Sequence, residues 1–330
     1  MEKYINMETP IAIVVVLLVA GFALLIKGAD FFVEGSSSVA KRMKIPSIII
    51  GLTIVAMGTS LPETAVSVTA SLSGNNALAV SNAVGSNIFN LMVVIGICAI
   101  ITPVAVGTDT IKRDVPFSAF CALLLLGLGI AGFADKSGMI LGHLDGAILL
   151  VFFAIYLGVL LKKTLDTVKS GKGQEAEENS KLVSIPLSII FIIGGGASIA
   201  IGGDLTVNTA SVIAKTLGMS DTLVGLTIVA IGTSLPELVT SIVAARKNEV
   251  GMALGNAIGS NVFNFLMVLG IASAISPIAF IKENVIDIIV LLVCTLSVWV
   301  FATTRKKINR IEGIIMVLIY LAYSAYIFIR

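Results

Sequence analysis

Two copies of the hexapeptide GTSLPE, at 58–63 and 232–237, each place a carboxylate and a proline inside a strongly apolar segment. Proline has no backbone N–H, so the carbonyl four residues before it loses its helical partner. A charged side chain at the centre of a membrane helix costs ~2.5–3.5 kcal/mol and by default marks a functional site. We therefore expect each copy to break a helix and to present its glutamate, Glu63 or Glu237, to a ligand together with carbonyl and hydroxyl oxygens.

A second set of polar side chains follows each copy at helical spacing. Residues four apart share one helix face, and the first set consists of Asn82, Ser86 and Asn90. The corresponding residues after the second copy are Asn256, Ser260 and Asn264. We expect Asn90 and Asn264 to be ligands, with interhelical hydrogen bonding as the alternative, and we expect Asn82 and Asn256 to support the site.

All of these groups are hard oxygen donors. Carboxylate, amide, hydroxyl and carbonyl oxygens suit Ca²⁺ and Na⁺, whereas Zn²⁺ and Cu⁺ favour Cys and His. Two carboxylates alone would repel each other, but one divalent cation, or two or three monovalent cations in adjacent pockets, would neutralise both. The alternative is that GTSLPE is only a proline kink, which explains the prolines but not two glutamates at equivalent depth. We therefore predict one cation site built from both copies, with no cofactor.

Composition identifies the elements that must hold this site. Of the 330 residues 57% are apolar and 13% charged, and the mean hydropathy is +1.04, so we predict an all-α polytopic protein embedded in the lipid bilayer. A net charge of +2 without a basic block argues against a nucleic-acid partner. The three cysteines are isolated from one another in apolar segments, and we therefore interpret them as core residues. They are Cys98, Cys121 and Cys294. His143, at a loop edge, is interpreted as structural or surface-exposed.

Ten hydrophobic segments are long enough to be transmembrane helices. They cover about 10–34, 46–72, 77–102, 115–133, 143–162, 183–207, 220–245, 250–275, 284–302 and 311–329. The only long polar stretch, 163–182, is predicted to be a cytoplasmic linker between an N-terminal part, 1–162, and a C-terminal part, 183–330.

The two parts are related by a shift of 174 residues. The shift aligns 51–106 with 225–280 without a gap, and 28 of these 56 positions are identical, polar residues included. With five predicted spans in each part, the second part enters the membrane from the opposite side. Such an inverted repeat is typical of secondary transporters, whose ion site lies at the repeat interface near the bilayer midplane.

Lysine and arginine residues indicate the orientation in the membrane. Sixteen of the 22 lie in connections that follow odd-numbered spans, and five lie on the opposite side. Because cytoplasmic loops carry an excess of Lys and Arg, we expect both termini to be extracellular. Asp30 and Asp204 are equivalent by the shift, and we interpret them as solvated helix-end residues, or as a pair with Lys27 in the case of Asp30.

The paired motifs GTSLPE…GSNIFN and GTSLPE…GSNVFN resemble the two α-repeats of the cation/Ca²⁺ exchanger superfamily, specifically the prokaryotic Na⁺/Ca²⁺ exchangers, over essentially the whole chain. The resemblance implies two inverted five-helix halves around four ion sites, with the first and sixth spans sliding against the other eight. By motif position it makes Glu63 and Glu237 the central Ca²⁺ ligands. The further oxygen donors that it implies, backbone carbonyls in the case of the two alanines, are Ala56, Thr59, Ser60, Ser86, Asn90, Ala230, Thr233, Ser234, Ser260 and Asn264.

One residue departs from the pattern of part of this superfamily. Some archaeal members and the K⁺-dependent branch have Asp at the position of Asn264, so Asn here resembles the K⁺-independent animal exchangers and leaves H⁺ and K⁺ dependence open. The Ca²⁺/H⁺ branch typically carries a GNxxE signature, and neither SNAVG nor GNAIG ends in Glu.

These observations predict a monomeric Na⁺/Ca²⁺ antiporter of the plasma membrane, in which Na⁺ moving inward expels Ca²⁺ by alternating access. A Ca²⁺/H⁺ antiporter that uses the same glutamates as proton carriers is the first alternative. A cation channel is the second, although channels normally surround their pore with repeated subunits or rings. An enzyme is not expected, because the sequence has no HExxH, no GxSxG and no plausible nucleophile–base pair.

Overall fold

The computed structural model describes residues 9–72, 77–134, 139–170, 182–219, 224, 228 and 230–329, and most of them are helical. The longer helices are α1 (Ile11–Arg42), α4 (Leu61–Leu72), α5 (Ala77–Phe89), α7 (Val115–Ala134), α8 (His143–Ser170), α9 (Ile185–Thr216), α12 (Leu235–Arg246), α13 (Val250–Phe263), α15 (Lys282–Arg305) and α16 (Arg310–Ile329). Shorter ones are α2 (Ser47–Ile50), α3 (Ala56–Thr59), α6 (Ile95–Ile101), α11 (Ala230–Thr233) and α14 (Leu269–Ile275). π-Helical turns adjoin several of these long and short helices, at η1 (Gly51–Val55), η2 (Asn90–Val94), η3 (Thr110–Asp114) and η5 (Asn264–Val268).

Most of the predicted membrane spans are present as apolar helices. Within the described ranges, eight helices are long and apolar enough to cross a membrane, or nine if the bent pair Ser47–Thr59 and Leu61–Leu72 forms one span. The predicted span 220–245 begins in a stretch that lies largely outside the described residues, and α11 and α12 are its described part. The chain is therefore a multi-pass helical membrane protein, while the count of ten spans stays a prediction.

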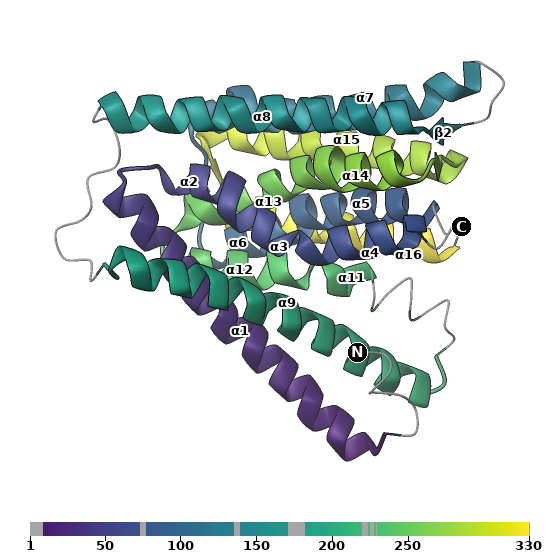
Figure 1. The fold of residues 1–330 in the computed structure, drawn as a ribbon, viewed down its shortest axis with the longest axis horizontal. Helices are drawn as coiled ribbons and strands as arrows, with labels where there is room; N and C mark the ends of the chain where they lie inside the picture. Colours follow the sequence, from purple (N-terminus) through teal and green to yellow (C-terminus); the bar gives the residue numbers. More distant parts are fainter. Residues whose placement is uncertain are drawn as a thin grey trace.

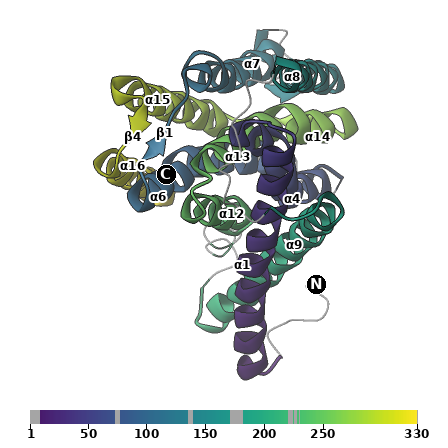
Figure 2. The same ribbon diagram turned by 90° about the vertical axis from the view of Figure 1, so that its left-hand side faces the viewer.

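Two helices stand apart from the others. α1 and α9 lie side by side and are inclined to the remaining helices, which run nearly parallel to one another (Figure 1). Figure 2 looks along those parallel helices, and there α1 and α9 run across the view. Each has 32 residues, which makes it about 48 Å long at 1.5 Å per residue. Because the hydrocarbon core of a bilayer is only ~30 Å thick, tilting fits such long helices to the membrane.

A seam of glycines joins α1 to α9. A methyl group added at Gly28 would lie 2.9 Å from the carbonyl oxygen of Gly195, and one added at Gly202 would lie 2.8 Å from that of Gly21. The residue number in α9 falls as that in α1 rises, so the two helices are antiparallel. Glycines seven residues apart stay on one helix face and let the backbones touch, which is how membrane helices associate without a hydrophobic driving force.

Both helices run past their predicted ends. α1 reaches Arg42 rather than 34, and α9 reaches Thr216 rather than 207. Small polar residues hide this continuation from a hydropathy pattern. In α1 the side chain of Ser36 is fully buried, and in α9 Thr209 donates its hydroxyl to the carbonyl of Leu205 at 2.6 Å. A helix can continue through a threonine such as Thr209 because its own backbone accepts the hydrogen bond of the hydroxyl.

The described start of the C-terminal part, at Leu182 and Val183, is held against the end of α1. α8 continues to Ser170, past the predicted start of the linker at 163, and residues 171–181 lie outside the described part. Where the described chain resumes, Arg42 donates to the carbonyl of Val183 at 2.9 Å and to that of Leu182 at 3.2 Å. The segment that leads into α9 is thus fixed to α1, so α1 and α9 form one unit.

Two short antiparallel strand pairs bridge the parts at the ends of helices. β1 (Val104–Ala105) pairs with β4 (Lys307–Ile308), and β2 (Ile140–Leu141) pairs with β3 (Ile278–Ala279). Each pair joins a connection in the first part of the chain to one in the second. These strands are not predictable from the sequence, because a strand of two residues is too short to show an alternating pattern.

The most enclosed helices are those that carry the asparagine-rich motifs. In the apolar windows of the continuous helical segments Ala79–Ile101 and Val250–Ile275, 78% of the residues are buried, against 22% in α1, α8 and α9. The polar groups of these two segments therefore lie at the centre of the helix assembly, where lipid and bulk water are excluded.

Candidate functional site

Each GTSLPE copy breaks its helix at the serine. The backbone angles of Ser60 (φ −84°, ψ 9°) and Ser234 (φ −92°, ψ 3°) leave the helical range, and α4 and α12 begin at the following leucine. The break thus comes one residue earlier than the preference of the residue before proline predicts. The reason is that proline fits the first turn of a new helix, where its missing N–H is not needed. In the first copy the two helical pieces are bent by 46°.

Hydrogen bonds cross between the two copies. Ser60 donates to Oε1 of Glu237 at 3.2 Å, and Ser234 donates to Oε1 of Glu63 at 3.5 Å. Ser260 contributes a further hydroxyl, 3.4 Å from the same Glu237 oxygen. The two serine–glutamate bonds are related by the 174-residue shift, and they bring the glutamates of both copies into one cluster. Each glutamate is thus held by the serine of the opposite copy.

The threonines of the motif face the first asparagine of the opposite part. Thr59 donates to Oδ1 of Asn256 at 3.0 Å, and Thr233 donates to Oδ1 of Asn82 at 3.4 Å. Asn256 in turn donates to the backbone carbonyl of Glu237 at 3.3 Å. Asn256 and Asn82 therefore accept the hydrogen bonds of the two threonine hydroxyls and orient them. This is the supporting role expected for the two asparagines.

Two asparagines that the sequence analysis did not select join the central helices. Asn87 donates to the backbone carbonyl of Asn261 at 3.1 Å, and Asn261 donates to that of Asn87 at 3.2 Å. Their side-chain oxygens accept from the predicted ligands: Asn264 donates to Asn87 at 3.0 Å, and Asn90 donates to Asn261 at 3.2 Å. Both lie off the helix face formed by the predicted residues. The signal that identifies them is an asparagine repeated at equivalent positions of two buried apolar helices.

The two backbone carbonyls predicted to bind ions, those of Ala56 and Ala230, lie just before the helix breaks. The Ala56 carbonyl accepts the N–H of Ser60 at 3.0 Å, and the Thr59 hydroxyl lies 3.4 Å from it. Ala230 is the first residue of α11, and Ser234 donates its N–H to Ile231, 3.1 Å away.

The cluster is closed to solvent and contains unused oxygen atoms. Each of the predicted site residues Thr59, Ser60, Glu63, Ser86, Asn90, Thr233, Ser234, Glu237, Ser260 and Asn264 is at most 5% exposed. Within the described part of the chain, the buried site oxygens without a hydrogen-bond partner are Oε2 of Glu63, Oε2 of Glu237, Oδ1 of Asn90, Oδ1 of Asn264 and Oγ of Ser86. A buried polar group without a partner costs ~1–3 kcal/mol. Such a set on facing helices favours a cation as the common partner.

No protein cation neutralises the two glutamates among the described residues, because the ion pairs found there all lie elsewhere. Two negative charges in a buried site are strongly unfavourable unless they are compensated. One Ca²⁺ balances both, and neutral oxygens complete the six to eight ligands that Ca²⁺ prefers. The arrangement can therefore bind hard cations.

α1 and α9 lie directly against both helix breaks. A methyl group at Gly58, the first residue of the first copy, would lie 2.7 Å from the ring of Phe32 in α1. A methyl group at Gly232 would lie 2.2 Å from Val207 in α9. The inclined pair thus packs against the segments in which both helices break.

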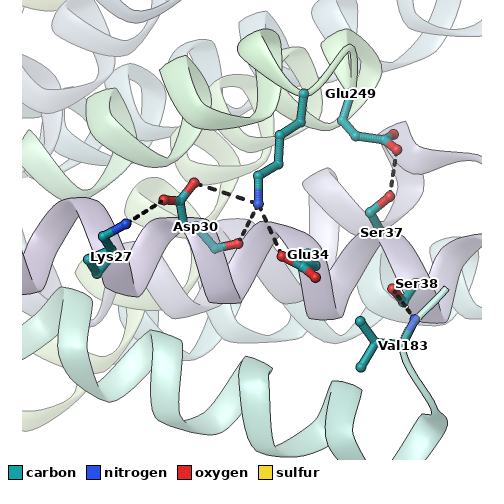
Figure 3. Close-up of polar contacts among 8 residues, drawn as sticks. Lys27, Asp30, Glu34, Ser37, Ser38, Val183 and Glu249 are labelled. Atoms are coloured by element: carbon teal, nitrogen blue, oxygen red, sulfur yellow. Dashed lines mark hydrogen bonds and ion pairs between the residues drawn. The ribbon is translucent and has the colours of Figure 1, made fainter. Parts of the chain in front are cut away.

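Charged residues of α1 outside the cluster form ion pairs at the surface. Asp30 lies 4.0 Å from Lys27 and 3.6 Å from Lys247 (Figure 3). Because α1 continues to Arg42, Asp30 lies inside the helix, so the helix-end interpretation is wrong, whereas the predicted pair with Lys27 is present. Its counterpart Asp204 is exposed and accepts from the side chain of Asn208 at 2.9 Å.

The residues assigned a structural role occupy such positions. The Nδ1 atom of His143 lies 2.9 Å from the carbonyl of Ala274 at an exposed site. The three cysteines are free thiols, and all are fully or almost fully buried. They are Cys98, Cys121 and Cys294. The interpretation of the cysteines as core residues is therefore confirmed.

Comparisons with known proteins agree with this geometry. A family model described as sodium/calcium exchanger protein matches residues 13–162 and 187–329. The chain is 38% identical over 328 residues to the putative antiporter CaxA of Alkalimonas amylolytica, an alignment that covers 95% of this chain and 98% of that protein. It is 31% identical to the sodium/calcium exchanger MaX1 of Methanosarcina acetivorans, with 94% and 97% covered.

Solved structures give the same fold. A structure of the sodium-calcium exchanger NCX_Mj soaked with Na⁺ and Ca²⁺ matches with a TM-score of 0.80 and 33% identity, and covers 95% of this chain and 98% of that one. A second structure of the same exchanger, soaked with Na⁺ alone, gives a TM-score of 0.80 and 34% identity over 96% and 99% of the two chains. The likeness therefore extends over nearly the whole molecule in both sequence and structure.

Proposed function

Because the chain belongs to the sodium/calcium exchanger protein family, we propose that it exchanges Na⁺ for Ca²⁺ by alternating access and normally extrudes Ca²⁺. Its family and its apolar helices make it a membrane cation antiporter. The choice of ions rests on one observation in particular. Glu63 and Glu237 are buried side by side with neutral oxygen donors, and the described residues supply no cation to balance them.

The proposed ligand roles follow from charge. Glu63 and Glu237 contribute the two negative charges that one Ca²⁺ neutralises, and the unpartnered amide oxygens of Asn90 and Asn264 complete its coordination. The remaining donors surround this centre and suit Na⁺, which needs neutral oxygens and a shared carboxylate. They are Ala56, Thr59, Ser60, Ser86, Ala230, Thr233, Ser234 and Ser260.

Coupling follows from the same electrostatics. An empty site leaves two carboxylates uncompensated in a low dielectric, so the empty protein meets a large penalty if it closes the site off from water. Either one Ca²⁺ or several Na⁺ removes that penalty and permits the site to pass from one side of the membrane to the other. Ion exchange is therefore favoured over uncoupled leakage.

The proposed moving part is the inclined pair α1 and α9. In this proposal ten spans form two inverted halves, 1–162 and 183–330, joined by the linker 163–182, and the pair slides against the other eight spans. Its glycine seam and the contacts of Phe32 and Val207 with the two helix breaks support this assignment. The protein acts as a monomer in the plasma membrane with both termini outside, so that inward Na⁺ movement drives Ca²⁺ out.

Transport by purified protein in liposomes tests the choice of ions. We expect an outward Na⁺ gradient to drive ⁴⁵Ca²⁺ uptake into the vesicles at constant pH, because Na⁺ leaving the lumen exchanges for Ca²⁺. Uptake that ignores the Na⁺ gradient but follows a pH gradient would identify a Ca²⁺/H⁺ antiporter instead. Single-protein currents of channel size would identify a cation channel.

Neutral variants of the two glutamates test the site. Glu63→Gln and Glu237→Gln should each weaken Ca²⁺ binding at least about 100-fold, because one charge ~4 Å from another is worth several kcal/mol at an effective dielectric constant of ~20. Glu283→Gln, the same change at an exposed residue near the start of α15, is the matched control and should transport normally. Normal Ca²⁺ transport by either site variant would reject the ligand assignment.

A further inference from the structure

We propose that Asn87 and Asn261 are positioning residues that turn the amide oxygens of Asn264 and Asn90 toward the transported cation. The inference rests on the proposed function, because it assigns a task within the same site. Each positioning residue serves the predicted ligand of the opposite half, and neither is itself proposed to touch the ion.

A backbone carbonyl determines how the first chain of amides is oriented. The carbonyl oxygen of Asn261 can only accept, so the group of Asn87 that lies 3.1 Å from it must be the amide nitrogen. The other end of that side chain is then an oxygen, and it must receive the amide nitrogen of Asn264 at 3.0 Å. The Asn264 oxygen consequently faces away from Asn87, and it is left buried without a partner.

The second chain repeats the first with the halves exchanged. The carbonyl oxygen of Asn87 receives the amide nitrogen of Asn261 at 3.2 Å. The side-chain oxygen of Asn261 then receives the amide nitrogen of Asn90 at 3.2 Å. The Asn90 oxygen is left buried and without a partner, as in the first chain. Two main-chain carbonyls, which cannot rotate, thus decide the direction of both ligand amides.

The direction matters because an amide has two unlike ends. If the side-chain amide of Asn90 or Asn264 were turned around, it would present its N–H₂ group to the cation. That group carries a partial positive charge and would repel the cation. The four asparagines are at most 1% exposed, so bulk water cannot take over the role of a lost partner. Loss of Asn87 or Asn261 should therefore weaken cation binding indirectly. The ligand, Asn264 or Asn90, keeps its side chain but loses the contact that orients its amide.

Double-mutant cycles of alanine variants test this crossed pattern. Asn87→Ala keeps the Asn87 carbonyl, so it disturbs Asn264 but leaves the chain from Asn261 to Asn90 intact. We expect Asn87→Ala to raise the KM for Ca²⁺ about fivefold, since a typical net hydrogen bond contributes ~1 kcal/mol. Combined with Asn264→Ala it should add little, whereas combined with Asn90→Ala the two factors should multiply. Asn261→Ala should show the reverse, with coupling to Asn90 alone.

A packing role gives a different result. If Asn87 only filled space, its effect would multiply equally with Asn90→Ala and Asn264→Ala, and this outcome would overturn the proposal. Should Asn87→Ala not yield folded protein, Asn87→Leu, which keeps the size of the side chain but can neither donate nor accept a hydrogen bond, replaces it in the same cycle. Loss of Na⁺-driven transport in the unaltered protein would instead refute the proposed function, so the two failures are distinct.

A different observation carries a second proposal: charged residues lock α1 to the connection between α12 and α13. Lys41 lies 2.8 Å from Oε1 of Glu249, and the hydroxyl of Ser37 donates to the same oxygen at 2.5 Å. Lys247 donates to the backbone carbonyl of Asp30 at 2.9 Å and lies 3.5 Å from the carboxylate of Glu34. Figure 3 shows the contact between Ser37 and Glu249, with Asp30 and Glu34 further along α1. We call these contacts of Lys41, Lys247 and Glu249 with their partners the latch. The latch connects the proposed moving pair, through α1, to the other helices.

The sequence of the opposite connection does not repeat the charges of this latch. By the 174-residue shift, Lys247 corresponds to Ser73 and Glu249 to Asn75, so the opposite connection lacks both charges. On α9, by contrast, Lys215 retains the charge of Lys41. A one-sided latch favours the conformation in which its own face, proposed above to be cytoplasmic, is closed. It therefore reduces the fraction of protein that can accept Ca²⁺ from that face.

Ca²⁺ affinity measured separately at each face tests the latch. Glu249→Gln or Lys247→Met, in vesicles of known orientation, should lower the apparent KM at the latch face about two- to fivefold and raise it at the other, because weakened ion pairs release the closed state. Lys307→Met, an exposed lysine in β4, is the charge-matched control. The exchange Lys41→Glu with Glu249→Lys should restore the original ratio.

Two outcomes would overturn the latch. One is an unchanged ratio of the two KM values in both single variants. The other is a charge exchange that leaves the ratio shifted, since the effect would then not depend on attraction between the two positions. Both are read against Na⁺-driven transport by the unaltered protein, whose absence would count against the proposed function alone.

Discussion

Single residues in this protein acquire their roles from partners in the opposite half. Ser60 holds Glu237 and Ser234 holds Glu63, although each serine is three positions from the glutamate of its own copy. The proline of the motif contributes by starting a new helix, and this places the serine in the non-helical conformation that aims it across the interface. A short motif with a local kink thus becomes half of a shared site.

Asn264→Asp tests whether the amide oxygen of residue 264 faces the ions. At low pH the protonated carboxyl can donate to Asn87 as the amide does, whereas the ionised form adds a third negative charge beside a bound cation. We expect the KM for Ca²⁺ in the variant to fall about tenfold as pH rises from 6 to 9, relative to the unaltered protein, because an added charge within several ångströms contributes at least ~1–2 kcal/mol. The measurement is ⁴⁵Ca²⁺ uptake across this pH range.

A matched change elsewhere controls for charge alone. Asn309 caps the start of α16 with its side-chain oxygen, at 2.9 Å from the N–H of Ile311, and aspartate caps a helix equally well. Asn309→Asp should therefore leave the pH profile unaltered. A profile of Asn264→Asp that matches the control would show that residue 264 packs the helices and does not bind ions.

At the scale of elements, the molecule separates into an inclined pair and a more parallel group. Within the pair, glycines at Gly21, Gly28, Gly195 and Gly202 bring the two backbones into contact. Toward the group, the pair meets the helix breaks through Phe32 and Val207. Backbone contact inside the pair and side-chain contact outside it favour movement of α1 and α9 as one body.

Gly195→Ala and Gly194→Ala compare neighbouring positions of α9. A methyl group at Gly195 would lie 2.7 Å from the carbonyl oxygen of Gly28 and 2.7 Å from the N–H nitrogen of Phe32, whereas none of the described atoms lies within 4 Å of one at Gly194. We expect Gly195→Ala to destabilise the protein by ~1–3 kcal/mol through overpacking. Gly194→Ala should be neutral or stabilising, because alanine favours the helix. Thermal unfolding in detergent measures both, and equal unfolding temperatures would contradict a tight seam.

At the scale of the whole molecule, two related halves surround one site but are not equivalent. The serine–glutamate and asparagine contacts repeat across the halves, as the 174-residue shift leads one to expect. The charges of Lys247 and Glu249 do not repeat, because the equivalent residues of the other half are Ser73 and Asn75. Symmetry at the centre suits ions that must be released to either side, and asymmetry at the rim can set which side is open at rest.

The sequence by itself determined the class of protein and most of its membrane helices, and it predicted which residues form the central cluster. Long apolar segments can only be satisfied in lipid as helices, and carboxylates inside them are too costly to be incidental. Membrane helices, their polar donors and the buried cysteines were therefore predictable from residue type and spacing. The family followed from the repeated motif, and the ligand roles and the two inverted halves remain predictions.

Only the tertiary structure decided which oxygen meets which donor. Asn87 and Asn261 lie off the predicted face, and their role arises from contacts between helices that are 174 residues apart in the chain. The ends of α1 and α9, the two-residue strands and the latch of Glu249 likewise depend on what packs nearby. Residue spacing fixes which groups share a helix face, but the partner of a buried polar group is chosen by the packing of other helices against it.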